Sequence, residues 1–278
     1  MPDVQTRLAQ AWEWRTLPDG TSQRILPHAV GLALAQSLGL HPGDLDRAAL
    51  ARDILPERYL RQLHGISLAD QRRLCHARVA QVGLGGLGGY VLEQLARAGV
   101  GFLRAADGDV FEPSNLNRQL LSANAFVGRP KTEAALDRVA RINPAVRLEA
   151  WPRMLDEAGM AELLQGTELV VDALGGLDDR PALRRAARAA GIPLVTAAVA
   201  GSTGYVAVAW PDREGVSDLL ARGGAGAENS LGTPAWTVAV AASLQANLAV
   251  RCLLGLAGED TPALVFDLAD GSFTPVRL

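Results

Sequence analysis

The feature that most constrains the fold of this chain is the glycine-rich segment 83–89, Gly-Leu-Gly-Gly-Leu-Gly-Gly. Residues 78–82 before it are mostly apolar, which predicts a short buried strand, and residues 90–98 after it predict a helix that ends at Gly99. A GxGxxG loop between a strand and a helix is typical of nucleotide-binding βαβ units. Its glycines let the backbone approach a phosphate at the positive end of the helix dipole. This loop therefore predicts a nucleotide site that includes Gly83, Gly85 and Gly88.

Predicted strands and helices alternate through the rest of the chain. Further strands are expected at 101–106, 146–151, 168–173, 193–198 and 204–210, and further helices at 131–143, 156–165, 179–190 and 237–256. The terminal segments 263–266 and 272–276 predict a β-hairpin. This order predicts an α/β, Rossmann-like fold: a mostly parallel sheet with helices on both faces and a C-terminal β-hairpin.

The first 55 residues have a different pattern. Short helical patterns at 4–12, 29–38 and 45–51 are separated by turn signals, and they carry no motif with recognisable chemistry. We therefore expect two parts, a small helical N-terminal appendage at 1–55 and a nucleotide-binding domain at 56–278. The glycine-rich stretch 223–232 is the best candidate for a mobile loop.

The composition excludes several classes of partner. A net charge of −3 and an aromatic content of 5% leave no basic field for nucleic acid or an anionic membrane, and no platform for stacking bases. The sequence shows no bilayer-length apolar run and no signal-peptide pattern. Cys75 and Cys252 form no CxxC pair and the four histidines are scattered, so we expect no metal site built from them. Two isolated cysteines favour a reducing, cytoplasmic location.

Charged residues at three places fit the ribose and phosphates of a nucleotide. Asp107 follows the second predicted strand, about twenty residues after the glycine loop, where a carboxylate can bind ribose hydroxyls. Arg118 lies in a polar segment, and Lys131, the only lysine among 27 basic residues, begins a predicted helix with no expected core contact. These two cations would clamp a triphosphate and stabilise charge on transfer. An NAD(P) pyrophosphate needs less cationic help, so an NAD(P)-binding oxidoreductase is the less favoured interpretation.

From about Arg58 to its C-terminus the chain resembles the ThiF/MoeB/HesA family, bacterial relatives of the ubiquitin-activating enzymes. Ordered sequence segments carry the resemblance. They are RYLRQ at 58–62, GLGGLGG at 83–89, AADGD at 105–109, SNLNRQ at 114–119, VGRPK at 127–131, RINP at 141–144, LVVDA at 169–173 and SLQA at 243–246.

The resemblance implies an activity and a set of ligands. Members of this family adenylylate the C-terminal glycine of a small ubiquitin-like sulfur carrier, so it implies ATP and Mg²⁺ as cofactors and a carrier ending in Gly-Gly, of the thiamin or molybdopterin type. It also implies that Gly86 approaches the ATP phosphates and that Asp107 binds the ribose. The remaining nucleotide-binding residues implied are Asn115, Arg118, Gln119, Lys131 and Asp172. Arg61 matches an arginine that the partner subunit inserts into the site, which implies a homodimer.

The chain departs from the family pattern at three places. Gly175 stands where the family has an aspartate that helps bind magnesium, so magnesium would be held mainly by the nucleotide and water, or by a displaced carboxylate such as Asp178 or Asp179. The zinc cysteines of many members are missing, so the terminal hairpin would hold by packing alone. The family's sulfur- or thioester-bearing cysteine would fall near Ser230, where there is none. We therefore expect adenylyl transfer without an enzyme thioester.

Two further interpretations stay open beside this activity. The losses at Gly175 and near Ser230 also fit a degenerate adaptor that binds nucleotide or carrier without turnover. An enzyme of the same kind could instead adenylylate a small-molecule or tRNA-attached carboxylate, although a pI of about 5.8 weighs against tRNA.

Overall fold

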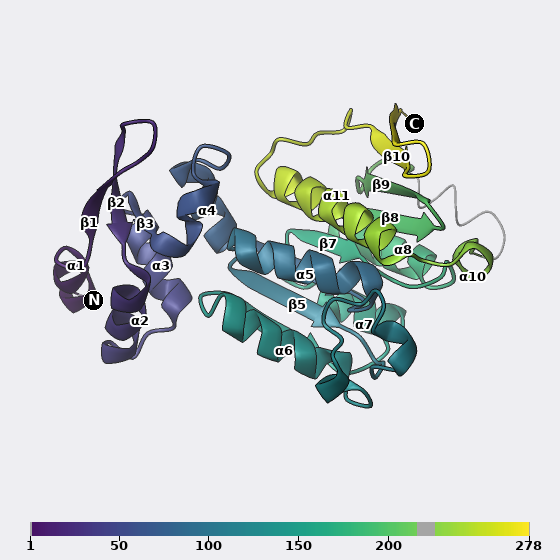
Figure 1. The fold of residues 1–278 in the computed structure, drawn as a ribbon, viewed down its shortest axis with the longest axis horizontal. Helices are drawn as coiled ribbons and strands as arrows, with labels where there is room; N and C mark the ends of the chain where they lie inside the picture. The colour runs from purple at the N-terminus through teal and green to yellow at the C-terminus, as the bar shows by residue number, and fades with distance from the viewer. Residues whose placement is uncertain (1, 216–225, 278) are drawn as a thin grey trace.

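The chain forms a large α/β domain with a smaller unit at one end (Figure 1). The computed structural model describes residues 2–215 and 226–277. Within them, the large sheet has eight strands in the order β11-β10-β9-β8-β7-β4-β5-β6. The strands are β4 (Arg78–Val82), β5 (Phe102–Ala106), β6 (Arg147–Trp151), β7 (Leu169–Asp172), β8 (Leu194–Ala200), β9 (Thr203–Ala209), β10 (Ala263–Asp267) and β11 (Ser272–Val276).

The sheet is parallel in its centre and antiparallel at one edge. Strands β6, β5, β4, β7 and β8 run parallel, whereas β8, β9, β10 and β11 pair antiparallel. The predicted C-terminal hairpin is therefore confirmed as β10 and β11, and it extends the sheet through β9. The stacked rings of Phe266 and Phe273, 5.8 Å apart, and a hydrogen bond from Ser202 to Asp267 hold it in place.

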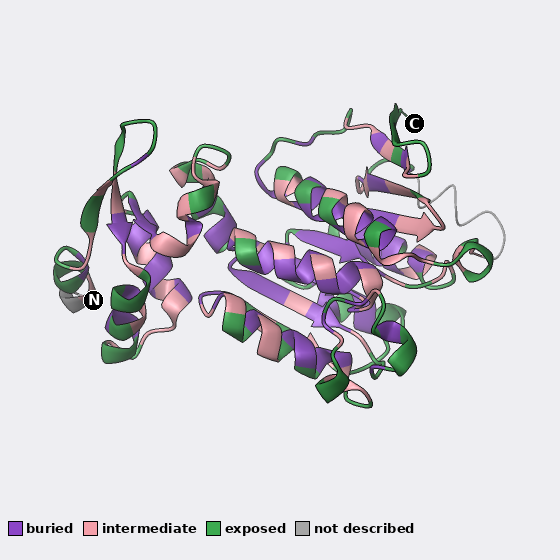
Figure 2. Ribbon diagram, viewed as in Figure 1, coloured by how far each residue is buried: buried purple, intermediate pink, exposed green. Residues whose placement is uncertain are grey.

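Helices cover both faces of this sheet, as predicted. The face helices are α5 (Gly86–Ala98), α6 (Lys131–Ile142) and α11 (Ala235–Leu253) on one side, and α7 (Glu157–Leu163) and α8 (Arg180–Ala190) on the other. Successive side chains of a strand point to opposite faces of the sheet, so each central strand contributes to both core layers. Val79, for example, packs with the first group of helices and Ala80 with the second. Figure 2 shows the resulting burial along the central strands.

Residues before the large domain form more than the helical appendage that the sequence predicts. Helices α1 (Pro2–Leu8), α2 (His28–Ser37) and α3 (Pro42–Leu50) are accompanied by β1 (Glu13–Thr16), β2 (Ser22–Leu26) and β3 (Ile54–Pro56). These strands form a three-stranded sheet in the order β1-β2-β3, so the purely helical expectation was wrong. Strands of three to five residues are too short to give a clear alternation, and the tertiary pairing decides their structure.

Polar contacts join this unit to the large domain across residue 56. Arg58, in the 3-10 helix η1 (Glu57–Gln62), pairs with the buried Asp46 of α3. Arg147 of β6 forms a second ion pair across this point, with Asp44 of α3 at 2.7 Å. After residue 56, Asn143 donates a hydrogen bond to the hydroxyl of buried Tyr59 at 3.1 Å, which ties η1 to the large domain. Helix α4 (Leu68–His76) then leads into β4. The two-part division at residue 56 stays a prediction.

The sequence analysis also predicts a helix at 237–256, which appears as α11 (Ala235–Leu253), and a mobile loop at 223–232 before it. Helix α11 is long and apolar enough to cross a membrane by composition alone, but half of its apolar window is buried within the fold, where the helix packs on α5 and β8. Of the expected mobile stretch, residues 223–225 lie outside the described residues, and Glu228–Leu231 form the short helix α10.

Candidate nucleotide-binding site

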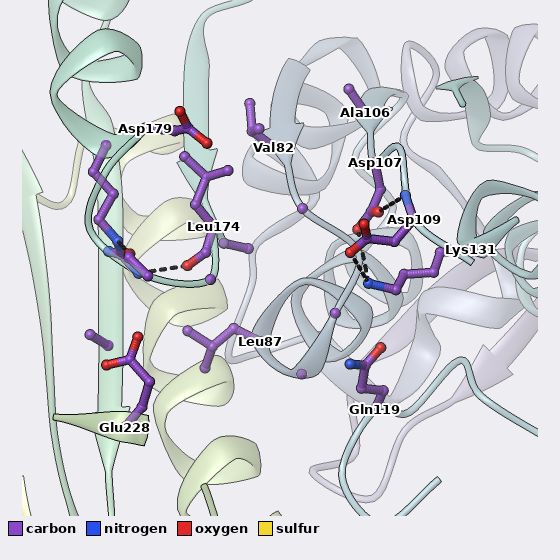
Figure 3. A pocket seen from close by; sticks show the side chains of 18 of the residues that line it. Val82, Leu87, Ala106, Asp107, Asp109, Gln119, Lys131, Leu174, Asp179 and Glu228 are labelled. Atoms are coloured by element: carbon purple, nitrogen blue, oxygen red, sulfur yellow. Dashed lines mark hydrogen bonds and ion pairs between the residues drawn. The ribbon is translucent and has the colours of Figure 1, made fainter. Parts of the chain in front are cut away.

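A cavity of about 750 Å³ opens at the carboxyl ends of β4, β5 and β7. Parallel strands place their carboxyl ends at one edge of the sheet, which is where α/β folds bind ligands. Asp107, Asp109, Lys131 and Gln119 gather on one side of this cavity, opposite Leu174, Asp179 and Glu228 (Figure 3). The predicted site residues that line it are Gly83, Gly85, Gly86, Asp107, Arg118, Gln119 and Lys131.

The glycine loop serves both packing and binding. Gly83 has a φ of +97°, and a side chain on Gly88 would lie 2.0 Å from the Gly83 carbonyl oxygen, so neither position admits another residue. Gly88 does not line the cavity, and its role is close packing of α5 on β4. Gly86 does line the cavity, at the N-terminus of α5. Buried Gln81, which the sequence analysis missed, donates from Nε2 to the carbonyls of Gly83 and Gly88, each at 2.9 Å.

Asp107 is fixed by the backbone around it. One of its carboxylate oxygens accepts a hydrogen bond from the Leu84 amide at 2.7 Å, and the other accepts one from the Asp109 amide at 2.8 Å. Asp107 thus ties the glycine loop to the end of β5 and keeps a carboxylate at the pocket wall.

Lys131 is buried, contrary to the expectation of a helix start without core contact. Its side chain is 7% exposed, and its Nζ lies 2.8 Å from Asp109 Oδ2 and 3.7 Å from Asp107 Oδ2. Two carboxylates thus hold this side-chain nitrogen at the cavity wall. The site therefore holds a preorganised cation beside the glycine loop.

The segment after β5 contributes Arg118 and Gln119. The Arg118 guanidinium donates to the Ser114 carbonyl at 2.9 Å and to Asn117 Oδ1 at 3.0 Å. The side chain of Gln119 is buried over Gly85, and its Oε1 has no hydrogen-bond partner within the described chain. Asn115, also predicted here, does not line the cavity; its Oδ1 accepts from the Glu112 amide and shapes the loop instead.

At the end of β7 the structure encloses Asp172 instead of exposing it. This residue is 1% exposed and does not line the cavity. Its Oδ2 forms an ion pair with Arg180 at 2.9 Å and accepts a hydrogen bond from Thr196 at 2.7 Å. Arg180 also donates to the carbonyls of Leu174, Gly176 and Ala197, so it holds the loop after β7 in place. No local sequence pattern signals Arg180, because its partners come from three separate strands and loops.

Arg61 lies far from the cavity of its own chain. It is exposed in η1, and Tyr59 of the same 3-10 helix packs against Gly99, at the end of α5 opposite the cavity. Figure 1 shows the neighbouring N-terminal unit and α4 beyond the end of the sheet where β5 begins, whereas the cavity lining lies at the other end of that strand. Any role of Arg61 in the site therefore requires a second subunit.

Several cavity residues escaped the sequence analysis. They are Arg153, Met154 and Leu155 after β6, Met160 of α7, and Glu228 and Asn229 of α10. The signal that could have found the first three is their position directly after a predicted parallel strand. The residues from α10 come from a distant segment, and only the fold brings them here.

The described part of the chain offers few side chains at the cavity that could bind a metal ion, and neither cysteine thiol lies there. Within it, no three His, Cys, Asp or Glu side chains are grouped to hold a metal ion. Asp179 and Glu228 are the cavity carboxylates with neither a salt bridge nor a side-chain hydrogen bond among residues 2–215 and 226–277. Burial raises the pKa of the Cys75 thiol to about 11 and that of the Cys252 thiol to about 12, and neither lines the cavity.

A parallel sheet with a GxGxxG loop, a carboxylate after the next strand and a buried ammonium beside it defines a nucleotide-binding α/β protein. The sequence profile of the ThiF family matches residues 59–278, and the chain belongs to this family. The molybdopterin-synthase adenylyltransferase of Escherichia coli K12 is 38% identical over 206 residues, which cover 71% of this chain and 82% of the relative. The sulfur carrier protein ThiS adenylyltransferase of the same organism is 33% identical over 234 residues, covering 79% and 89%.

Solved structures share the fold. PaaA is 24% identical, with a TM-score of 0.66 over 80% of this chain and 82% of that one. The complex of E. coli MccB with ATP is 20% identical, with a TM-score of 0.66 over 80% and 70%.

Proposed function

We propose that this protein uses ATP to adenylylate the C-terminal glycine carboxylate of a small ubiquitin-like sulfur carrier ending in Gly-Gly. The observation that carries the proposal is the buried Lys131 ammonium, held by Asp107 and Asp109 beside the glycine loop. Its relatives named as molybdopterin-synthase and ThiS adenylyltransferases support the substrate class.

In the proposed reaction, a carboxylate oxygen of the carrier attacks the α-phosphorus of ATP and pyrophosphate leaves. The carboxylate is ionised at neutral pH, so the step needs no general base. The protein contributes position and charge: Gly85 and Gly86 let the phosphates approach, and Asp107 faces the ribose. Lys131 and Arg118 offset the negative charge on the triphosphate as pyrophosphate departs.

Magnesium enters this proposal as part of the substrate MgATP. Mg²⁺ is usually held by substrate phosphates, waters and one or two carboxylates. Asp179 suits that single-ligand role, because it lines the cavity and its carboxylate has no partner within the described residues. Asp172 does not suit it, since its pairing with Arg180 and Thr196 encloses it.

We further propose that no enzyme thioester forms. Both thiols lie away from the cavity and stay protonated at neutral pH, because burial raises their pKa values. The acyl adenylate would then pass to an external sulfur nucleophile. We also propose a cytoplasmic homodimer in which Arg61 of one subunit reaches the other's site.

A second candidate is an adaptor that binds nucleotide or carrier without turnover. Gly175, at the cavity wall, carries no carboxylate, and the enclosed Asp172 does not replace one. This candidate shares the ligands of the proposed function but not its chemistry.

ATP–pyrophosphate exchange separates these functions. We expect exchange that depends on a carrier ending in Gly-Gly and is unchanged in the double variant Cys75→Ala, Cys252→Ala. A carrier truncated by its last glycine is the matched control. ATP binding without exchange would support the adaptor, and loss of exchange in a folded, ATP-binding double variant would contradict the thiol-free reaction.

A further inference from the structure

Beyond Asp107, the cavity wall changes from polar to apolar. Val82, Ala106 and Met160 line it and belong to the core layer under α7 and α8. Leu155 and Leu174 pack on the same layer and also line the cavity. Because Asp107 faces the ribose in the proposed function, this apolar wall is where the nucleobase would lie.

Arg153 stands at the edge of this apolar wall. It follows β6, the strand next to β5, and the segment that carries it lies against Gly108. A side chain on Gly108 would approach the Met154 nitrogen to 2.6 Å and the Arg153 carbonyl carbon to 3.0 Å. The backbone of β6 also accepts a hydrogen bond from the Asp107 amide at 3.2 Å, through Trp151. Arg153 is therefore placed beside the turn that holds the predicted ribose ligand.

Two neighbours set the orientation of the Arg153 guanidinium. Its Nη2 lies 2.6 Å from Glu162 Oε2, and its central carbon lies 4.6 Å from the centroid of the Trp151 ring. The side chain remains half exposed. The guanidinium thus lies over an aromatic ring, and an arginine plane can stack on a second ring on its other side.

Charge balance distinguishes Arg153 from the phosphate-binding cations. Lys131 and Arg118 come from the segments beside the glycine loop, where the phosphates would bind. Arg153 comes from the next strand outward, and its charge is already compensated by Glu162. A compensated guanidinium beside an apolar wall is suited to stacking on a base and poorly suited to a triphosphate.

We propose that Arg153 forms a wall of the nucleobase subsite, with its guanidinium sandwiched between Trp151 and the purine ring of the bound nucleotide. This assignment rests on the proposed function, since it requires a nucleoside triphosphate in the cavity. In this assignment Arg153 recognises the base by stacking, and Glu162 positions the Arg153 guanidinium.

Calorimetric titration with ATP and with inorganic tripolyphosphate tests this assignment, because tripolyphosphate lacks both ribose and base. Arg153→Met should weaken ATP binding about tenfold and leave tripolyphosphate binding unchanged. Arg153→Lys keeps the charge but not the plane, so its ATP affinity should fall between those of Arg153→Met and the wild type. Arg185→Met is the matched control, because Arg185 forms an exposed ion pair with Glu157 and does not line the cavity.

Tryptophan fluorescence provides a second readout. ATP should change the emission of the wild-type protein, and that change should be lost in Trp151→Phe and reduced in Arg153→Met, with tripolyphosphate giving none. Equal ATP affinities of the wild type and Arg153→Met would overturn the sandwich while leaving the proposed function intact. Equal weakening of ATP and tripolyphosphate would assign Arg153 to the phosphates and overturn it as well. A wild-type protein that binds no ATP would overturn both the stacking role of Arg153 and the proposed function.

Discussion

Lys131 combines two roles that a surface lysine could not combine. Its ammonium neutralises Asp109 and lies near Asp107, so it contributes to the fold of the turn after β5. The same ammonium faces the cavity beside the glycine loop. Removal of this side chain therefore affects both stability and chemistry.

We expect Lys131→Ala to lose about 2 kcal/mol of unfolding free energy, because it leaves two carboxylates without their cation, one of them buried. Adenylate formation should fall about a hundredfold or more. Denaturant unfolding and pyrophosphate exchange measure the two effects. Arg129→Ala is the control, since Arg129 forms an exposed pair with Glu133, and its stability should change by less than about 0.5 kcal/mol. Unchanged exchange in Lys131→Ala would remove this residue from the site.

The strand-loop-helix element β4–α5 separates structural glycines from binding glycines. Gly86 and Gly88 are two residues apart, but a Cβ on Gly88 would overlap the Gly83 carbonyl, whereas one on Gly86 would meet a Val238 methyl at 3.2 Å. A valine side chain can shift by a few tenths of an ångström, and a loop backbone fixed by Gln81 cannot.

Gly88→Ala should therefore cost more than about 3 kcal/mol of unfolding free energy, or prevent folding. Gly86→Ala should stay within about 1 kcal/mol of the wild type but bind ATP more weakly, because its methyl group narrows the path of the phosphates. Thermal unfolding and ATP titration of both variants check this contrast. A stable Gly88→Ala protein that binds no ATP would contradict the packing role of Gly88.

Helices and strands with a regular spacing of apolar residues could be predicted from the sequence. The strand expected at 168–173 appears as β7, Leu169–Asp172, and the helix expected at 131–143 as α6, Lys131–Ile142, because apolar periodicity and Pro144 mark them locally. Side-chain roles and short strands that depend on tertiary contacts could not be predicted in this way. Arg180 and Arg153 acquire their roles from partners such as Asp172 and Trp151, and short strands such as β3 exist only because β2 pairs with them.

At the scale of the whole molecule, the N-terminal unit lies beyond the end of the large sheet where β5 begins (Figure 1). The cavity is lined by residues at the opposite, carboxyl ends of β4, β5 and β7. Arg61 belongs to the end with the N-terminal unit, where it is exposed. A dimer that brings this end of one subunit to the cavity of the other would let Arg61 act there.

Mixed dimers test that arrangement. Arg61→Ala and Lys131→Ala should each be inactive alone, and the mixture should recover about a quarter of wild-type exchange, since half of randomly mixed dimers carry one complete site of two. Activity of the mixture after proven subunit exchange is the measurement. A mixture that stays inactive, or a strict monomer in size-exclusion chromatography, would rule out the role of Arg61 between subunits.

The enclosure of the single lysine has a consequence for side reactions. An acyl adenylate is a mixed anhydride, and amines are the side chains that it acylates most readily. Every other basic side chain counted with Lys131 is an arginine, whose guanidinium stays protonated and does not act as a nucleophile. Lys131 itself is an ammonium paired with two carboxylates. The protein thus presents no exposed lysine amine to its proposed product, so an activated carrier could leave the site without becoming attached to a lysine of the enzyme that activated it.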